Sequence, residues 1–420
     1  MPDISSKDRS RLRELAKKQA ALAHTPQMDA LRALWYRHND CEHVRPMVVI
    51  ELGTFCDEMI APLLQCEGEA ARDIEAKLLS NTFNHEQFHD DSVVPDSFPI
   101  ATGGWLKLFN HDDKRVVARD AAGRQSVGHQ FVHLIDDLEE DYDRIEDSVY
   151  GWDEAGAQRQ LTFYQELLGD ILPVRFAGTS LYSVPTQKLV HMMGMEVMYY
   201  ALCDYPELFL KLMDRLANDT IAYFRFLEEK NLLLPTVDFE WLGQGTYCCT
   251  KKLPGPAENA RRPFKTTDIW GFMDSQETVS ISPEMYEEFI FPCYKRIASQ
   301  YGALSYGCCE PVHPIWDKCL STLGNLRRVS ISPWCDEEAM GERLRGTNIV
   351  YHRKPSPNFI GVGDRLDEDA ARAHIRKTVE ASRGCELEFT QRDVYTVKGD
   401  AAKVRRYVEI IREESERHRY

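Results

Sequence analysis

Short apolar runs rich in β-branched residues recur along the chain, each bounded by Gly, Pro or polar residues. Runs of about four to eight such residues are typical of buried parallel strands. Eight segments fit this description: RPMVVIELG from Arg45, DSVVP near Val93, ILPVRFAG from Ile171, DIWGFMD from Asp268, GALSYG from Gly302, LRRVSIS from Leu326, NIVYH from Asn348 and CELEF from Cys385.

Helical patterns separate the later runs. The clearest is SPEMYEEFIFPCYKRIASQYG, in which Ser282 can cap a helix, Pro283 fits its first turn and Gly302 ends it. Alternation of strand and helix predicts a parallel sheet, because parallel neighbours need a long crossover. Eight repeats predict an α/β fold of the (β/α)8 TIM barrel type.

A minimal barrel takes about 250 residues, so the remaining residues must lie outside it. The first part of the chain alternates charged residues with Leu and Ala and breaks at Pro26, which indicates helices. We therefore predict an amino-terminal helical extension over residues 1–44 and a barrel over 45–420 with insertions near 98–170 and 210–265. The Gly- and Pro-rich loop GQGTYCCTKKLPGP, from Gly243, can cover the barrel mouth.

Composition narrows the class of protein. The chain carries 51 Lys and Arg against 67 Asp and Glu, a net charge of -16, and no basic patch, which argues against nucleic acid as a partner. No stretch resembles a signal peptide or a membrane span, so we expect a cytoplasmic protein that does not bind membranes. Most of the 12 cysteines should then be reduced.

The chemistry of a barrel lies at the carboxyl ends of its strands. The segment YGCCEPVH follows the fifth run and contains Cys308, Cys309, Glu310 and His313. Thiols, a carboxylate and an imidazole are ligands of zinc, and Cys335 after the sixth run can add a further thiol. The alternative is that these adjacent cysteines pack as small apolar side chains.

Other strand ends also carry polar side chains. Asp274 to Glu277 can orient a substrate or exchange a proton with it, or can form hydrogen bonds at a helix start. His352, Arg353 and Lys354 can hold a substrate carboxylate, although ion pairs with Asp336 or Asp393 explain these cations equally well. The cluster His85 to Asp91 contains a His-x-x-x-His spacing, which alone is a weak metal signal.

Three segments resemble one superfamily. FMDSQETVSISPEMYEEF, Phe272 to Phe289, is similar to the fourth-strand region of uroporphyrinogen decarboxylases and of the corrinoid methyltransferases that share their barrel. PVRFAGTSLYSVPTQKLVHMMG, from Pro173, resembles the third-strand region. GALSYGCCEPVH lies where the methyltransferase branch carries a His-x-Cys zinc motif. The resemblance covers roughly residues 45–415.

The sequence departs from both branches of that superfamily. Decarboxylases carry an arginine-rich segment after the first strand, whereas Ile50 to Glu58 contains no arginine. The methyltransferase branch binds zinc through its His-x-Cys motif and a later cysteine; this chain keeps Cys308 but has Tyr306 in place of the histidine and no cysteine within Thr390 to Val397. The chain thus resembles a divergent member of the superfamily that fits neither standard branch.

The resemblance implies an enzyme that moves a methyl group between cobalamin, or a corrinoid carrier protein, and a small acceptor. Cys308 would activate the acceptor, Glu277 and His313 would orient or deprotonate it, and Lys354 would bind an anionic group. The full set of predicted residues is: catalytic Cys308, Glu277, His313 and Asp274; substrate-binding Glu51, Gln276, Trp334, His352, Lys354 and Asp393; zinc-binding Cys308, Cys309, His313 and Cys335.

Two alternatives stay open. One is a cofactor-free decarboxylase of a porphyrinogen-like tetrapyrrole acid, in which Asp274 and Glu277 would pair with pyrrole nitrogens. The other is a non-catalytic protein that binds a tetrapyrrole or corrinoid. Barrel enzymes are often dimers, and a homodimer is the assembly to test.

Overall fold

A parallel sheet forms the centre of the computed structural model, which describes residues 3–119, 125–177, 181–236 and 241–418. Within these residues the sheet has seven strands, in the spatial order β1 (Met47–Ile50), β15 (Glu386–Gln391), β14 (Val350–Arg353), β13 (Leu326–Ile331), β12 (Ala303–Tyr306), β11 (Trp270–Met273) and β8 (Leu181–Ser183). The predicted parallel α/β sheet is confirmed. Six of the eight predicted runs, the first and the last five, each contain one of these strands.

The predicted second strand near Val93 is wrong, and no hydrogen-bonded closure of the barrel is detected among the described residues. In the described residues no strand joins β1 to β8. Instead, side chains satisfy the free edge of β1: Asp91 Oδ2 accepts from Val48 N (2.9 Å) and Asp90 Oδ2 from Ile50 N (2.8 Å). Since carboxylates take these backbone donors, the following residues leave the edge of β1 and pack beneath the amino-terminal helices.

The third predicted run lies outside the main sheet. Its strand β7 (Val174–Phe176) pairs with β2 (Phe98–Ile100) in a separate two-stranded sheet. The position next to β11 belongs to β8, only three residues long. In β8, Leu181 and Ser183 are buried while Tyr182 stacks on Phe272 of β11. A strand this short, with a polar residue at its end, has no distinctive hydrophobic pattern.

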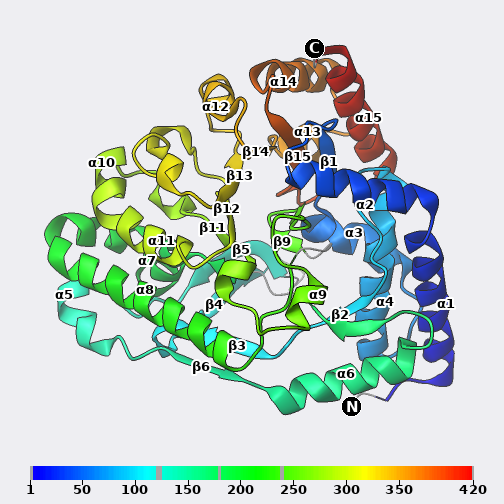
Figure 1. Cartoon of the computed structure of the whole chain (residues 1–420), viewed down its shortest axis with the longest axis horizontal. Helices are drawn as coiled ribbons and strands as arrows, with labels where there is room; N and C mark the ends of the chain where they lie inside the picture. The colour runs from blue at the N-terminus through cyan, green and yellow to red at the C-terminus, as the bar shows by residue number, and fades with distance from the viewer. Residues whose placement is uncertain (1–2, 120–124, 178–180, 237–240, 419–420) are drawn as a thin grey trace.

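Helices cover the outer face of the sheet and both of its flanks (Figure 1). The helices α11, α12, α14 and α15 pack outside the later strands, and α7 and α8 flank β8 and β11. The helices are α1 (Ser6–Ala23), α2 (Pro26–Asn39), α3 (Cys56–Ile60), α4 (Glu69–Phe83), α5 (Leu138–Asp141), α6 (Glu154–Leu168), α7 (Pro185–Asp204), α8 (Pro206–Glu229), α9 (Pro256–Asn259), α10 (Pro283–Met285), α11 (Phe291–Ala298), α12 (Glu337–Leu344), α13 (Asn358–Gly361), α14 (Glu368–Ala381) and α15 (Ala401–His418).

The helix predicted after β11 forms, but as three joined pieces. Ser282 accepts a hydrogen bond from Met285 N at the predicted cap. A π-helical turn over Tyr286–Ile290 then separates α10 from α11. Pro292, at the start of α11, has no N–H to donate, which disrupts the regular helical hydrogen bonding at this point.

The inner face of the sheet combines apolar side chains with buried charged ones, and two segments pack against it. One is the end of α2, where His38 lies between Glu386 and Glu388 of β15. The other is the hairpin β9 (Trp241–Gly243) and β10 (Thr246–Tyr247), whose Thr246 donates to Glu388. Arg328 of β13 is fully buried against Glu388 in the same layer. The interior therefore holds a connected network of charges.

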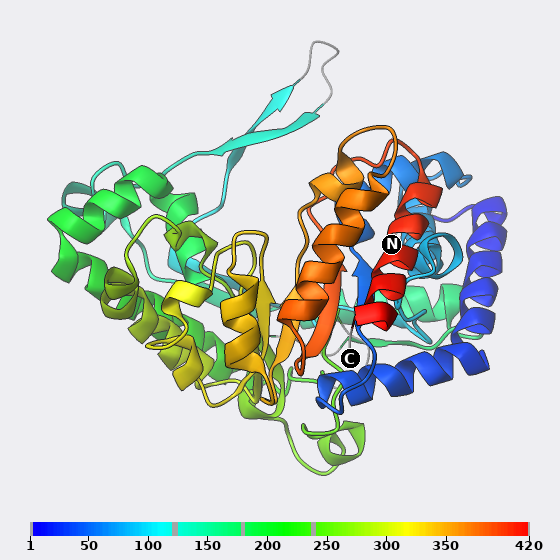
Figure 2. The same cartoon turned by 90° about the horizontal axis from the view of Figure 1, so that it is seen from above.

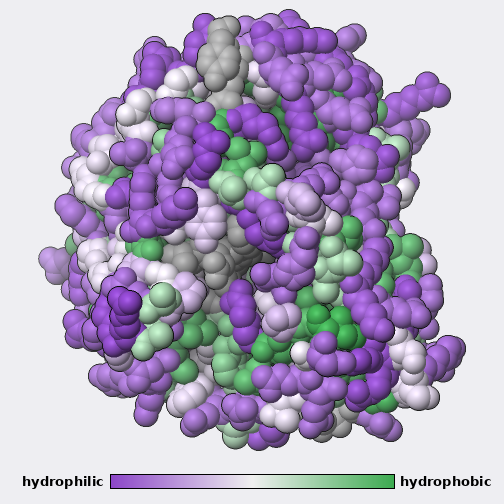
Figure 3. All heavy atoms as spheres, turned by 45° about the vertical axis from the view of Figure 1, so that its right-hand side comes forward, coloured by the Kyte–Doolittle hydropathy of each residue, from purple (hydrophilic) through white to green (hydrophobic). Residues whose placement is uncertain are grey.

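The insertion at 98–170 contributes β2, β3 (Gly104–Lys107), β4 (Arg115–Arg119), β5 (Gln125–Phe131), β6 (Val149–Trp152) and α6. Figure 2 shows the β4–β5 hairpin projecting away from the rest of the molecule. Figure 3 shows one face of the surface, on which polar side chains predominate and apolar ones form separate patches. Among the described helices, none combines the length and apolar character that a membrane crossing requires.

Candidate functional site

Polar side chains from five strands meet at the carboxyl edge of the sheet. Each follows its strand directly: Glu51 after β1, Asp274 after β11, Cys308 and its neighbours after β12, Lys354 after β14 and Arg392 after β15. Because the strands are parallel, these positions share one edge. Contacts among them, described next, join them into one cluster, which we call the strand-end cluster: Glu51, Asp274, Cys308, Cys309, Glu310, Lys354, Arg392 and Asp393.

A pair of thiols forms the middle of the strand-end cluster. Cys308 Sγ and Cys309 Sγ lie 3.5 Å apart, after a turn in which Gly307 has φ +98°. The hydrogen bond with Cys309, together with burial, raises the pKa of Cys308. The same hydrogen bond lowers the pKa of Cys309 against the effect of burial, with help from Lys354 and Arg392. Of the two thiols, Cys309 is therefore the one that ionises more readily.

Two cations, Lys354 and Arg392, help to lower the pKa of Cys309. Lys354, only 3% exposed, donates from Nζ to Gln244 Oε1 (2.9 Å) and to the carbonyl oxygens of Gly307 and Cys308. These three acceptors occupy its ammonium, so Lys354 fixes the thiol turn instead of presenting a free donor to a substrate. Gln244 belongs to the loop predicted to cover the mouth, and this contact places that loop over the cluster.

Arg392 is the second cation. Its Nη1 lies 3.5 Å from Cys308 Sγ, and its Nε donates to Glu51 Oε2 at 3.2 Å. Burial opposes the charge of Arg392, but Glu51 and the thiols raise its pKa. Asp393 completes this side of the cluster, with Oδ2 3.6 Å from Cys309 Sγ. A carboxylate is thus within reach of the Cys309 proton.

Asp274 is the unsatisfied group of the strand-end cluster. Its side chain is 1% exposed and its Oδ1 has no hydrogen-bond partner. Burial first, then the nearby Glu310 carboxylate and the Cys308 thiol, raise the pKa of Asp274 well above its usual value. The surroundings of Asp274 therefore favour its neutral, protonated form, and its Oδ1 is left to be satisfied by a bound molecule.

Glu310 ties the two loops of the cluster together. Its Oε1 accepts from Ser275 N and its Oε2 from Cys308 N, both at 2.9 Å, and the residue is 3% exposed. One carboxylate therefore fixes the backbone beside Asp274 and the backbone of the first thiol. Hydrogen bonds from backbone N–H groups to a buried carboxylate are among the stronger ones in proteins.

Several predicted residues lie near the cluster without joining it. Glu277 accepts from Thr186 Oγ1 at 2.8 Å, and burial raises its pKa; Gln276 precedes it in the same turn. His352 is buried one layer below, 2.8 Å from Thr390 Oγ1, and burial lowers its pKa. These residues support the floor of the site, and the structure shows no contact between them and the thiols.

Three predicted residues form a different group. His313 Nδ1 accepts from Asp336 N at 3.1 Å, Cys335 is buried beside it, and Trp334 is 75% exposed. Burial lowers the pKa of His313 and raises that of Cys335. The chain bends over residues 308–310, and His313 packs against the loop after β13.

The four predicted zinc ligands consequently do not form a metal site in this geometry. Across the described residues, no group of three or more His, Cys, Asp or Glu side chains is arranged to hold a metal ion. Thiolate ligands are available at Cys308 and Cys309, but catalytic zinc takes three protein ligands. No step proposed below depends on zinc.

Some cluster residues were not among the predicted site residues. Arg392 and Glu310 were visible at strand ends, yet nothing in the sequence shows that they contact Cys308. Two neighbours of the cluster were not predicted either. Tyr182 lies on the short strand β8. Gln244 accepts a hydrogen bond from Lys354 because the β9–β10 hairpin packs against the inner face of the sheet. Gln244 has φ +58° between two glycines, which was the available signal of a tight turn.

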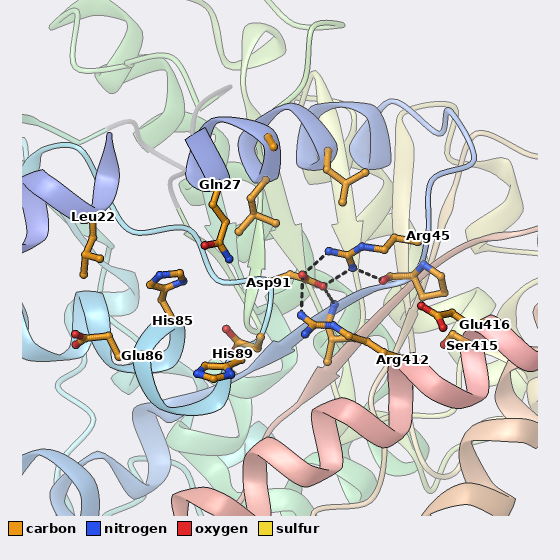
Figure 4. Close-up of a pocket in the computed structure, with 16 residues that line it drawn as sticks. Leu22, Gln27, Arg45, His85, Glu86, His89, Asp91, Arg412, Ser415 and Glu416 are labelled. Atoms are coloured by element: carbon orange, nitrogen blue, oxygen red, sulfur yellow. Dashed lines mark hydrogen bonds and ion pairs between the residues drawn. The ribbon is translucent and has the colours of Figure 1, made fainter. Parts of the chain in front are cut away.

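A separate cavity of about 1080 Å³ lies outside β1, between α2 and α15 (Figure 4). His85 and His89 of the predicted His-x-x-x-His cluster line it, while Glu86 pairs with Lys18. Arg45 and Arg412 both bind Asp91, so two guanidinium groups share this one carboxylate. Since chemistry in this fold lies at strand ends, the cavity is distinct from the candidate site.

Comparisons with known proteins agree with the fold. The chain is similar in structure to a methyltransferase from Methanosarcina mazei, with a TM-score of 0.50 and 14% sequence identity, over 91% of this chain and 98% of that one. Neither a scan of protein-family models nor a search of curated proteins finds a match. The likeness defines an α/β class of fold that a methyltransferase also uses.

Proposed function

We propose that the protein is a methyltransferase whose reaction takes place at the strand-end cluster. The observation that carries the proposal is the Cys308–Cys309 thiol pair at a strand end, where the hydrogen bond from Cys308 and the charges of Lys354 and Arg392 lower the pKa of Cys309. A thiolate held in this way is a base and a nucleophile near neutral pH. The shared fold with a methyltransferase supports the same reading.

In the proposed reaction Cys309 activates a small acceptor that carries an ionisable proton. The acceptor proton moves to the Cys309 thiolate, and the acceptor's electron pair forms the new bond to the methyl carbon. The bond between methyl and donor breaks, and the donor keeps its electron pair. Asp393, 3.6 Å from Cys309, can then take the proton on toward solvent.

Asp274 and Glu310 have supporting roles in this proposal. Neutral Asp274 donates a hydrogen bond from its unpartnered carboxyl group to the bound acceptor. Glu310 keeps the thiol turn in place. The family resemblance implies cobalamin as donor, which when bound supplies a methyl carbon that accepts an electron pair. The exposed Trp334 and Tyr395, after β13 and β15, offer apolar surface to a large flat donor.

To test the proposal, the protein is incubated with methylcobalamin and a small thiol as acceptor, and the absorption spectrum of the cofactor is measured over time. We expect demethylation that depends on protein and acceptor. A spectral shift without turnover would indicate a binding protein, and release of carbon dioxide from uroporphyrinogen would indicate a decarboxylase. Either result contradicts the proposal.

A further inference from the structure

The chain contains two pairs of adjacent cysteines, and the structure treats them differently. The thiols of Cys308 and Cys309 lie on the same side of their turn, 3.5 Å apart. The pair Cys248 and Cys249 follows β10 in extended chain, and its two side chains enter different apolar clusters. Cys248 packs with Trp270, and Cys249 packs with Trp35. Only the first pair can bind one ligand through both sulfurs.

The geometry of the Cys308–Cys309 pair is fixed by its surroundings. Glu310 holds Cys308 N at 2.9 Å, and Lys354 donates to the carbonyl oxygens of Gly307 and Cys308. The turn is therefore preorganised, and binding of a bridging ligand does not carry the entropy cost of ordering it. Cys309 is partly exposed and Cys308 is buried, so a ligand reaches the pair from the side of Cys309.

We propose that Cys308 and Cys309 form a two-sulfur binding site for a trivalent arsenic compound. With sulfur bonds of about 2.3 Å, the length typical of a thiolate on a soft ion, sulfurs 3.5 Å apart subtend an angle of about 100° at the bridging atom. That angle suits a pyramidal centre with a lone pair. Soft thiolate ligands also match the softness of arsenic(III).

The number of ligands favours arsenic over zinc. A zinc site requires three or four protein ligands, and the described part of the chain offers no such group around the thiols. A monosubstituted arsenic(III) compound brings its own third substituent, so two thiols complete its coordination.

The binding reaction is balanced without an oxidant. An arsenoxide and two thiols give two arsenic–sulfur bonds, while the arsenic–oxygen bond breaks and the oxygen leaves as water with both thiol protons. Arsenic stays trivalent. The inference goes beyond the proposed methyl transfer, although a bound arsenical would occupy the same thiols and should block that reaction.

The test uses phenylarsine oxide with the whole chain. Intact mass spectrometry should show one adduct per chain, and titration should give an affinity that falls at least 100-fold in Cys309→Ser and in Cys308→Ser, because loss of one sulfur removes the chelate. The control Cys248→Ala, which alters the divergent pair, should keep full affinity. The exposed Cys203→Ser provides a second control that leaves the core intact.

Three results would overturn the proposal: no adduct, an adduct that survives Cys309→Ser at full affinity, or an adduct lost in Cys248→Ala while that variant keeps the wild-type circular dichroism spectrum. Competition by zinc at equal concentration would likewise favour a metal site and contradict the choice of arsenic(III). An adduct in a protein that does not demethylate methylcobalamin leaves the arsenic site standing and removes the proposed function.

Discussion

The inner face of the sheet and its carboxyl edge both bury charged side chains, but they satisfy them to different extents. On the inner face Arg328 donates to Glu388, to Tyr247 O and to Asn39, and His38 bridges Glu386 and Glu388. Two cations face two carboxylates in this network. At the carboxyl edge, Asp274 keeps an unpartnered oxygen, and two thiols lie 3.5 Å apart.

This difference distinguishes buried charges that stabilise the fold from buried groups that can react with a bound molecule. A fully paired buried network specifies how elements fit together, here how α2 and the β9–β10 hairpin enter the sheet. A buried acid with an empty hydrogen-bonding position, beside a thiolate, is arranged to meet another molecule. We therefore expect substitutions on the inner face to change stability and substitutions at the edge to change chemistry.

The largest effect on stability should come from Arg328→Met. The substitution leaves Glu388 buried without its guanidinium, and removal of one member of a buried ion pair costs about 3–5 kcal/mol. Urea denaturation should show this loss. The exposed pair of Arg296 with Asp214 is the control, since Arg296→Met should cost under about 1 kcal/mol. Equal losses of unfolding free energy in Arg328→Met and Arg296→Met would contradict a special role of the buried network in stability.

A smaller loss, about 1.5–3 kcal/mol, should follow from His38→Gln, because hydrogen bonds to charged groups are worth roughly that much. Burial opposes protonation, but the bonds to Glu386 and Glu388 raise the pKa of His38. A raised pKa means that its contribution is complete below the unfolded-state value of about 6.5 and is lost as pH rises through the folded-state value.

Denaturation curves of wild type and His38→Gln should therefore converge as pH rises. A stability difference that is independent of pH, or that grows with pH, contradicts a charged His38.

The smallest effect on stability should be that of Asp274→Asn, within about 1 kcal/mol near neutral pH, because burial already favours the uncharged form of Asp274 in the folded protein. A raised carboxyl pKa gives stability that is lost as pH rises through the folded-state value. The asparagine variant should thus become the more stable protein at high pH. Thermal melts from pH 5 to 9 check this, and a strong loss at every pH would place Asp274 among the structural charges.

The sequence predicts the sheet well where the hydrophobic pattern is continuous. The runs containing β11 to β15 are apolar, bounded and regularly spaced, and each forms a strand of the sheet. The second run fails because Asp90 and Asp91 bind the edge of β1 through their side chains, a role that no local pattern reveals. The edge strand β8 is too short to be recognised.

The sequence predicts those site residues that directly follow a recognisable strand. Asp274, Cys308 and Lys354 follow their strands directly, and the parallel sheet brings them to one edge. Arg392 acts on Cys308 across the sheet, which sequence spacing cannot indicate. His313 is only five residues from Cys308, but after the bend at 308–310 it contacts Asp336 instead.

The most direct test compares methyl transfer from methylcobalamin in wild type, Cys309→Ser and Cys203→Ser as a function of pH. Because its pKa is lowered, Cys309 should ionise at a lower pH than an ordinary cysteine, and the wild-type rate should rise with pH through that pKa and then level off. Cys309→Ser should lose about 10²–10⁴-fold of the rate, the usual worth of a positioned acid–base group, and Cys203→Ser should lose none. A wild-type rate in Cys309→Ser would contradict a reaction centred on the thiol pair.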